Sequence, residues 1–540
     1  MRRHADLLGL LVAGLCARFA LIFRYRFDSD ESQHMHVAWG WSHGLVQYRD
    51  VFDNHMPLFH LMTAPLFAGG SDDPRLLFAA RLLMVPLFAS ATMLVWFIAH
   101  RLFEDDRIAL VAAAITALFP PYFLGSLEYR TDDLWVVCWL GVIAVGVSRM
   151  RLRSRSILGG LLLGASFGVS MKSVLCAGAL LVAAGGVFFL TRARTAWPPV
   201  RTLLLSAATT LALACSIPLI IALSFAATGN WKPFLYGVFE HNRVPFEHAW
   251  RVLWFVPLYF VVRAAALSIL RSDGDPSLVR RRLFVCLACG AYSIGLIAFW
   301  PMSSLESYLP IYPLALLFVA PWLAEQRRVA ALTFATIELV AVIITAQPWR
   351  NEAQHEIALV SEIVALTGAH DPVMDLKGES VFRARPWYFG IEAITNVKLR
   401  MGIIQDHIAE SLVRTSTHVV VSDRLPPLAK RFVLANYVDW GLVRIAGVRL
   451  PPVPQGTPVA FRIAIPGDYL VTGEAGSVAA AIDGKAVVHT IHLTPGRHTL
   501  VTSHAVRHPL VIWEGARRWP AGRDCPACDA ERSGPYVAGR

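Results

Sequence analysis

Long apolar runs alternate with short polar loops from residue 7 to residue 347. A helix that crosses the hydrocarbon core of a bilayer needs about 17–25 mostly apolar residues, and about eleven runs have such a length. The pattern therefore predicts a polytopic α-helical membrane domain over residues 1–349. The expected spans are 7–25, 76–100, 107–124, 133–149, 157–171, 174–190, 202–225, 251–270, 283–299, 308–324 and 328–347.

Arginine-rich segments fall between alternate spans, at residues 2–3, 101–107, 149–155, 192–201, 271–282 and 327–328. Loops rich in Lys and Arg stay on the cytoplasmic side of a membrane. We therefore expect a cytoplasmic N-terminus, and we expect everything after about residue 350 to lie outside. This predicts a multi-pass protein of the cell inner membrane with a periplasmic C-terminal part. The same arginine clusters account for the net charge of +11, so nucleic acid is not an expected partner.

The remainder of the chain has the texture of folded domains outside the membrane. Residues 350–450 mix helix-like stretches (351–367 and 404–415) with short β-rich runs (373–376 and 418–422), which predicts an α/β domain. From 451 to 516, short runs such as 461–465, 480–482 and 492–494 are each followed by a turn signal, which predicts a small β-sandwich. The tail, 517–540, is predicted to be poorly ordered and dispensable for activity.

Six of the eight cysteines lie in predicted spans, where a thiol is usually a small buried apolar group. The other two, Cys525 and Cys528, form a CPAC motif in the tail. A disulfide in an oxidising compartment is the favoured interpretation, with a metal half-site and a redox motif left open.

Candidate chemistry begins directly after the first span, where residues 27–57 carry the adjacent carboxylates Asp30 and Glu31. Charges near the hydrocarbon are costly, so a cluster there predicts a functional site. A second acidic pair, Asp132 and Asp133, follows Arg130 at the start of the fourth span, on the same predicted side. Two alternatives remain open. Asp132 or Asp133 could simply cap a helix N-terminus, and Asp30 could be a solvated loop charge.

Other polar residues fall in the loops that are predicted to be external. Lys172 lies between spans five and six, and Glu306 and Tyr308 precede span ten. The loop 228–250 contains His241 and Arg243. Cations there can neutralise a phosphate, although each alone could equally be a snorkelling interfacial side chain. His34 and His36 are a weak metal signal because no paired-histidine helix motif or cysteine partner accompanies them.

The order of these motifs resembles the polytopic GT-C glycosyltransferases. The chain has Asp-Glu after span one, the stretch FDNHMPL at 52–58 and RTDDL at 130–134, and YLPIYP at 308–313 looks like the Tyr-x-x-Pro stretch of such enzymes. The branches it resembles are the protein O-mannosyltransferases, the lipid A aminoarabinose transferases and the related lipopolysaccharide core sugar transferases. The resemblance covers roughly residues 1–350.

The resemblance implies transfer of a sugar from a polyprenyl-phosphate donor to a lipid, glycan or protein acceptor on the external face, with inversion at the anomeric carbon. Asp30 matches the acidic catalytic position, beside Glu31, and Asp132 matches the second acidic position. Substrate contacts are then expected from Asp53, Arg130, His241, Glu306 and Tyr308. Many relatives carry Lys-Pro-Pro where this chain has HMP at 55–57, so His55, Lys172 and Arg243 are the candidates for the donor phosphate.

The chemistry agrees with that implication. A sugar hydroxyl needs a carboxylate base, and the departing phosphate needs Lys, Arg, protonated His or a divalent metal. The cofactor stays unknown, with a divalent metal left open. The rival hypotheses are a transporter or flippase of a lipid-linked sugar, for which inverted repeats and charges near the middle of the membrane are typical, and an external scaffold protein.

Overall fold

The computed structural model describes residues 5–193, 196–245, 249–272, 275–302, 304–326, 328–421, 424–473 and 476–518. Two compact units divide the chain. The membrane unit comprises Met1–Tyr25, Asn54–Leu66 and Phe78–Asn351, and the C-terminal unit comprises Arg26–Asp53, Phe67–Leu77 and Glu352–Arg540. Cys525 and Cys528, and with them the predicted tail disulfide, lie outside the described residues.

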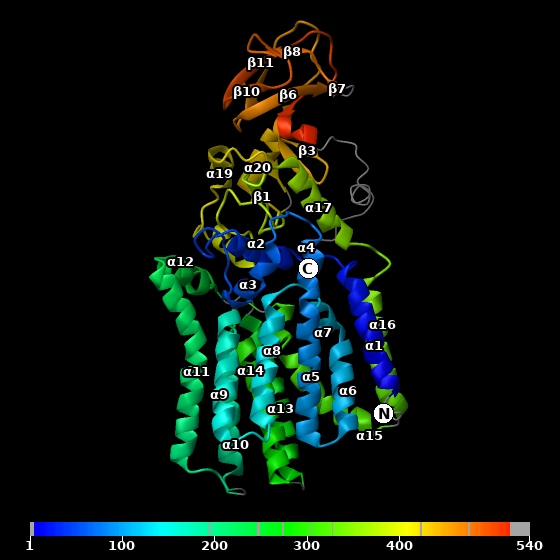
Figure 1. The fold of residues 1–540 in the computed structure, drawn as a ribbon, viewed down its shortest axis with the longest axis vertical. Coiled ribbons are helices and arrows are strands. Elements are labelled where there is room, and N and C mark those ends of the chain that lie inside the picture. The colour runs from blue at the N-terminus through cyan, green and yellow to red at the C-terminus, as the bar shows by residue number, and fades with distance from the viewer. Residues whose placement is uncertain are drawn as a thin grey trace. The chain divides into compact units, whose positions relative to one another are not determined.

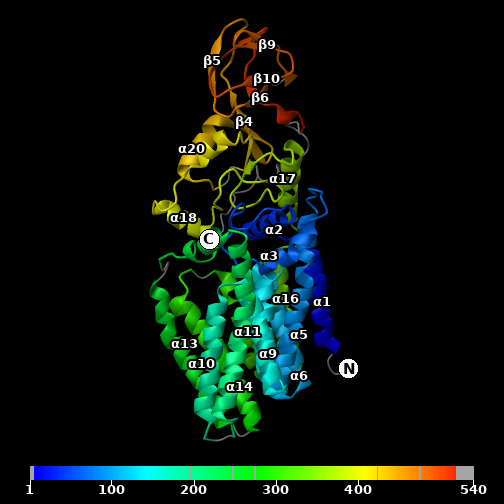
Figure 2. The same ribbon diagram turned by 60° about the vertical axis from the view of Figure 1, so that its left-hand side comes forward.

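Helices dominate the chain before residue 350, and those of the membrane unit run side by side in both views (Figure 1 and Figure 2). They are α1 (Ala5–Ile22), α2 (Ser29–Ser42), α3 (Leu58–Thr63), η2 (Ala64–Phe67), α4 (Leu76–Leu82), α5 (Met84–Phe103), α6 (Asp106–Leu118), α7 (Pro120–Gly125), α8 (Thr131–Val147), α9 (Leu152–Val169), α10 (Ser173–Thr191), α11 (Val200–Ala227), α12 (Trp231–Leu235), η3 (Tyr236–Glu240), η4 (Ala249–Trp254), α13 (Phe255–Arg271), α14 (Pro276–Phe299), η5 (Leu305–Tyr308), α15 (Ile311–Glu325) and α16 (Arg328–Ala346).

Seven helices among the described residues are long and apolar enough to cross a membrane. They are Ala5–Ile22, Leu76–Phe103, Ser173–Thr191, Val200–Ala227, Trp250–Arg271, Pro276–Phe299 and Val329–Ala346. The chain is therefore a multi-pass membrane protein, and the predicted polytopic α-helical class is confirmed. Each expected span falls on helical residues, but shorter helices such as α6 and α8 account for part of them, so the number of about eleven stays a prediction.

Helix α9 packs closely on α11 through glycines spaced four residues apart. A Cβ atom on Gly160 would lie 2.8 Å from the Thr210 backbone oxygen, and one on Gly164 would lie 2.9 Å from the Leu213 backbone oxygen. Small residues at such positions let two helix backbones approach within van der Waals contact, which is how helices associate inside a membrane. This packing holds α9, which ends at Val169, three residues before Lys172.

The C-terminal unit combines helices with two sheets. Its helices after residue 350 are α17 (Ala353–Leu366), α18 (Ala393–Arg400), α19 (Ile408–Arg414), α20 (Pro427–Asn436) and η6 (Glu514–Arg518). Its strands are β1 (Val373–Met374), β2 (Val419–Val420), β3 (Tyr437–Trp440), β4 (Val443–Arg449), β5 (Val459–Ile463), β6 (Gly467–Gly473), β7 (Gly476–Ser477), β8 (Ala480–Ile482), β9 (Lys485–Val487), β10 (Ile491–Leu493), β11 (Gly496–Thr502) and β12 (Leu510–Trp513).

The larger sheet has the order β1-β2-β4-β12-β6-β10, with β3 beside β4 and β7 beside β6, and the smaller sheet has the order β5-β11-β8-β9. Strand β1 pairs with β2 in parallel, whereas β12 pairs antiparallel with β4 and with β6. The larger sheet thus joins residues on both sides of position 450, and one hydrophobic core runs from Leu359 to Ala516. The β-rich C-terminal part is confirmed, and the boundaries at 450 and 516 stay predictions.

Candidate functional site

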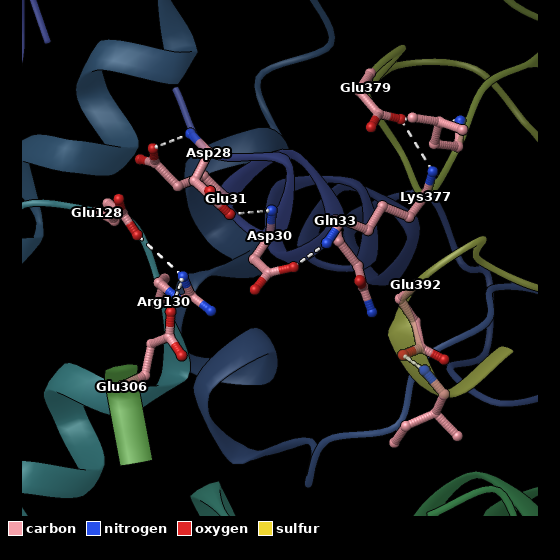
Figure 3. A network of polar contacts seen from close by, with 12 residues as sticks. Asp28, Asp30, Glu31, Gln33, Glu128, Arg130, Glu306, Lys377, Glu379 and Glu392 are labelled. Carbon is pink, nitrogen blue, oxygen red and sulfur yellow. Dashed lines mark hydrogen bonds and ion pairs between the residues drawn. The ribbon is translucent and has the colours of Figure 1, made fainter. Parts of the chain in front are cut away.

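In the membrane unit, a buried guanidinium joins two carboxylates. Arg130 Nη1 lies 3.0 Å from Glu128 Oε2 and 3.0 Å from Glu306 Oε1 (Figure 3). Arg130 directly precedes α8, and Glu306 lies in η5, so one side chain ties together two segments that are far apart in the sequence. The Arg130 side chain is only 8% exposed. Because a buried charge is costly unless it is paired, the three charges form one interdependent cluster.

A second buried ion pair lies beside this cluster. Lys172 Nζ donates to Asp132 Oδ1 over 3.0 Å, and Arg130 Nε lies 3.8 Å from Asp132 Oδ2. The ammonium also lies 5.4 Å from the centroid of the Trp135 ring, in cation–π geometry. Trp135 donates its indole N–H to Ser173 Oγ over 3.0 Å, so the ring beside the ammonium is held in place.

Glu306 and Tyr308 both lie in η5, which is hydrogen-bonded to α14. The hydroxyl of Tyr292 donates to the backbone oxygen of Ser307 over 2.9 Å, which fixes this turn. Glu306 Oε1 is used by Arg130, whereas Oε2 is buried and has no hydrogen-bond partner among the described residues. An ionised carboxylate is an acceptor only. The second oxygen of Glu306 can therefore accept a hydrogen bond from a hydroxyl group of a bound molecule. Tyr308 is half-buried at the end of the turn.

Asp133, one residue further along α8, has a different environment. Both acids of the pair lie in the first turn of α8, whose N-cap residue, Arg130, makes no side-chain capping bond. Asp133 interacts electrostatically with Arg18 of α1, a fully buried guanidinium that donates to the Phe123 backbone oxygen and to Ser126. The cation with the largest electrostatic effect on Asp133 is Arg18, although Asp133 also senses Asp132, Glu128 and Arg130. Neither Asp132 nor Asp133 is the N-cap residue.

The remaining predicted residues of the membrane unit lie near a hydrogen bond between Asn242 and Asn54. Asn242 Nδ2 donates to the backbone oxygen of Asn54 over 3.0 Å, which joins the loop after η3 to the segment before α3. In that loop, His241 is fully buried, with its Nδ1 atom 3.4 Å from the Tyr236 hydroxyl, whereas Arg243 is exposed. His55 is half-buried and interacts electrostatically with Asp132.

In the C-terminal unit, the stretch that carries the first acidic pair is a helix rather than a loop. Helix α2 begins with a capping box: Asp28 Oδ1 accepts from the backbone N–H of Asp30 over 2.9 Å, and Glu31 Oε1 accepts from the backbone N–H of Asp28 over 2.9 Å (Figure 3). This arrangement satisfies N–H groups that a helix start otherwise leaves unpaired. Glu31 is fully buried in this role.

Asp30 follows the cap and is paired with a lysine from far along the chain. Its Oδ1 atom contacts Lys377 Nζ, and the two side chains are 31% and 11% exposed (Figure 3). Burial lowers the pKa of Lys377, but the charge and hydrogen bond of Asp30, together with the charges of Asp28 and Glu379, raise it above its usual value. Lys377 is therefore charged at neutral pH.

Asp53 has a clear positioning role inside the same unit. Gln33 Nε2 donates to Asp53 Oδ1 over 3.2 Å, and Gln47 Nε2 donates to Asp53 Oδ2 over 2.6 Å. The carboxylate is fully buried, so it ties α2 to the turn that follows it. His36 of α2 is also buried, which lowers its pKa, and its Nδ1 atom lies 2.9 Å from the backbone oxygen of Val381.

Glu128 and Lys377 are among the charged residues of these groups that were not predicted. Glu128 lies two residues before Arg130, and its proximity to the RTDDL stretch was an available signal. Lys377 lies in a loop with no motif around it, and it contacts Asp30 only because the chain returns after 347 positions. Pairing over such a separation cannot be read from one sequence.

Comparisons with known proteins bear on the fold. The family model described as dolichyl-phosphate-mannose-protein mannosyltransferase matches residues 62–221, and no curated protein sequence matches the chain. Among solved structures, ArnT from Cupriavidus metallidurans in the apo state is 12% identical with a TM-score of 0.56, covering 81% of this chain and 97% of that chain. ArnT bound to undecaprenyl phosphate is 11% identical with a TM-score of 0.58, covering 82% and 98%. This chain therefore shares the fold of ArnT, and the GT-C-type membrane fold that its motifs predicted is confirmed.

Proposed function

We propose that this chain is a membrane glycosyltransferase that takes a sugar from a polyprenyl-phosphate donor. It transfers that sugar, with inversion, to a lipid, glycan or protein acceptor on the external face. The ArnT fold, in a relative whose structure is bound to undecaprenyl phosphate, and the match of residues 62–221 both support this class. The observation that carries the proposal is the buried cluster of Arg130 and Lys172 with their three carboxylates at the ends of membrane helices.

Asp30 is the general base in this proposal. A sugar hydroxyl is a poor nucleophile at neutral pH, so inverting transfer requires a carboxylate that removes its proton as it attacks. Asp30 is ion-paired to Lys377, which favours its ionised form, and its side chain is 31% exposed. It therefore combines the charge and the accessibility that a base needs.

Lys172 and Arg130 compensate the departing phosphate. The bond to the anomeric carbon breaks with its electron pair on the phosphate oxygen, so negative charge grows there and cations placed nearby stabilise it. Lys172 gives one of its three N–H donors to Asp132, and the other two can serve the phosphate. Removal of either cation would leave buried carboxylates uncompensated.

The carboxylates of the cluster accept hydrogen bonds from hydroxyl groups of the substrate. Glu306 Oε2 is the clearest candidate because it is buried and has no hydrogen-bond partner among the described residues. Asp132 orients Lys172 and, with it, the phosphate. His55, His241, Arg243 and Tyr308 remain proposed substrate contacts, and Asp53 acts by positioning α2.

The proposed orientation has a cytoplasmic N-terminus and a periplasmic C-terminal unit, in the cell inner membrane, because arginine-rich loops alternate along the chain. The transporter alternative is not favoured, since the cluster of Arg130, Asp132 and Glu306 lies at the start of α8 and in the short turn η5. A reporter fused after residue 350 should be active only if it is exported, and cytoplasmic activity would overturn the orientation.

Mass spectrometry of surface lipids and glycans from cells with and without this protein tests the function. Cells that lack the protein should lose one pentose or hexose from a surface molecule, and the wild-type chain should restore it. Asp30→Asn keeps the size of the side chain and removes its basicity, so turnover should fall at least about 100-fold. Asp439→Asn, on a side chain that is 78% exposed, is the matched control and should restore the sugar. An unchanged mass profile, or full restoration by Asp30→Asn, would overturn the proposal.

A further inference from the structure

A tightly folded loop of the C-terminal unit carries Lys377. Its centre is the fully buried carboxylate of Asp375, which accepts from Gly378 N over 3.0 Å, from Ser380 N over 2.8 Å and from Ser380 Oγ over 2.6 Å. Arg385 Nε donates to the same carboxylate over 2.7 Å. Four donors on one buried acid define the path of this loop, because any other path would leave a buried charge unpaired.

The loop is also fixed against α2. His36 Nδ1 lies 2.9 Å from the backbone oxygen of Val381. Gly378 has φ +124°, and a Cβ atom there would lie 2.8 Å from His36 Cβ and 3.2 Å from the Ser32 backbone oxygen. Only glycine accepts both that backbone conformation and that close approach. The loop and the helix are thus in direct van der Waals contact.

These restraints define where the Lys377 side chain begins. Glu379 Oε2 accepts from the backbone N–H of Leu376 over 3.0 Å and from that of Lys377 over 2.9 Å (Figure 3). The backbone of Lys377 is therefore held on one side by Glu379, while its ammonium group contacts Asp30 Oδ1. The side chain is 11% exposed along its length, which restricts its rotamers.

We propose that Lys377 is a positioning residue for the transfer reaction: it holds the Asp30 carboxylate ionised and oriented at the start of α2. This inference rests on the proposed function of Asp30. It gives a segment more than three hundred residues downstream an indirect role in the reaction, through its contact with Asp30.

The surrounding charges explain why such a cation is needed. Asp28 and Glu31 lie at the same end of α2 as Asp30, and Glu379 faces Lys377 from the loop. Like charges disfavour ionisation of a carboxyl group, and an opposite charge within about 4–6 Å favours it by about 1–3 pKa units. Without the ammonium, Asp30 would lie beside Asp28 and Glu31, and Arg26 already pairs with Asp28 over 3.3 Å. A protonated carboxyl group cannot accept the proton of the acceptor hydroxyl.

The pH dependence of kcat/KM for sugar transfer by the purified full-length chain tests this role, because its acid limb reports the essential base of the free enzyme. We expect Lys377→Met to move that limb upward by about 1 pH unit or more. Transfer should then fall further below wild type on the acid side of the profile and approach wild type as the pH rises. Lys377→Arg keeps the charge and should keep the limb near its wild-type position. Lys430→Met, on an exposed lysine of α20, is the control and should change nothing.

Several outcomes would overturn the inference. One is an acid limb that stays in place in folded Lys377→Met. Another is an equal loss at every pH together with a lower melting temperature, which would make Lys377 a purely structural residue. If Lys377→Met does not reach the membrane, Lys377→Gln replaces it, and the same shift of the acid limb is expected. The proposed function fails separately, by a wild-type chain without transfer or by a fully active Asp30→Asn.

Discussion

The Nζ atom of Lys172 lies 3.0 Å from Oδ1 of Asp132, although the two residues are 40 positions apart. Their side chains are 17% and 5% exposed. Lys172 directly precedes α10, and Asp132 lies in the first turn of α8, so the pair joins the starts of two helices. At this degree of burial, neither charge is stable without the other.

The first prediction concerns the stability of that pair. Lys172→Met leaves Asp132 with the more distant guanidinium of Arg130 and the weaker interaction with His55, so we expect the free energy of unfolding to fall by about 3–5 kcal/mol. Adding Asp132→Asn removes the uncompensated charge and should recover a large part of the loss. Thermal or denaturant unfolding in detergent measures both effects.

The control for this prediction is an exposed ion pair. Arg49 Nη2 lies 2.7 Å from Asp50 Oδ2, with side chains that are 50% and 29% exposed. Surface pairs contribute about 0–1 kcal/mol, so Arg49→Met should have a small effect. Equal losses from the two substitutions would contradict the view that burial makes the Lys172 pair critical.

A second prediction concerns pH and Glu362 of α17. Burial raises the pKa of this carboxyl group to about 7, and the backbone N–H of Leu442 donates to its Oε2 atom over 3.0 Å. A folded pKa above the ordinary value of 4.5 means that the stabilising contribution is complete below pH 4.5 and is lost as pH rises through 7. Ionisation therefore destabilises the C-terminal unit by on the order of 3 kcal/mol.

Glu362→Gln should remove that pH dependence. The amide oxygen still accepts from Leu442, and no charge appears at high pH. We expect the variant to melt at a higher temperature than wild type at pH 8.5 and to differ less from it at pH 5. Glu410→Gln, on a side chain that is 69% exposed, should follow the wild type at both pH values. A wild-type melting temperature that rises from pH 5 to pH 8.5, parallel to that of Glu362→Gln, would contradict the assignment.

The third prediction separates two roles of Glu31. A glutamine can complete a capping box as well as a glutamate does, so Glu31→Gln should keep α2 folded with a change of under about 1 kcal/mol. Because Glu31 is fully buried and accepts a backbone hydrogen bond, we expect it to lose less transfer activity than Asp30→Asn. Comparing turnover of the two variants at equal melting temperature tests this. A loss as large as that of Asp30→Asn would support the catalytic role predicted for Glu31.

Much of the fold could be predicted because it depends on local patterns. Apolar runs of spanning length fall on the helices from α1 to α16, and the strand expected at 480–482 is β8. Helix α2 was expected to be a loop, because many of its buried side chains are polar and give no apolar period. The Asp28-x-x-Glu31 spacing is a capping-box signal that marks its start. The strand order that interleaves β4, β12 and β6 depends on tertiary pairing.

The candidate site was predictable where its residues share a motif or a helix end. Arg130, Asp132, Lys172 and Glu306 were all expected as site residues, and the structure brings them together through ion pairs. Which of these residues form ion pairs with each other could not be predicted from the motifs. Which acid meets Lys172 depends on how α8, α9 and α10 pack, and the close approach of α9 to α11 at Gly160 and Gly164 appears only when the two helices meet.

The last prediction uses the two acids of α8, which are adjacent in sequence but interact most strongly with different cations, Lys172 for Asp132 and Arg18 for Asp133. Asp132 holds Lys172, so Asp132→Asn should lower transfer by about tenfold or more through misplacement of the phosphate-binding cation. Asp133 acts on Arg18, whose hydrogen bonds go to the neutral groups of Phe123 and Ser126. Asp133→Asn should therefore lower stability by about 1–3 kcal/mol, while turnover per folded molecule stays near wild type.

The matched control is Asp106→Asn, which changes an acid in the first turn of α6 whose side chain is 73% exposed. It should alter neither quantity, since a surface charge near a helix start contributes only about 0.3–1 kcal/mol. Turnover and melting temperature, measured on the same purified samples, separate the two roles. If Asp133→Asn abolished transfer in stable protein while Asp132→Asn remained active, Asp133 would be the functional acid, and the assignment of Asp132 and Lys172 to the donor phosphate would be wrong.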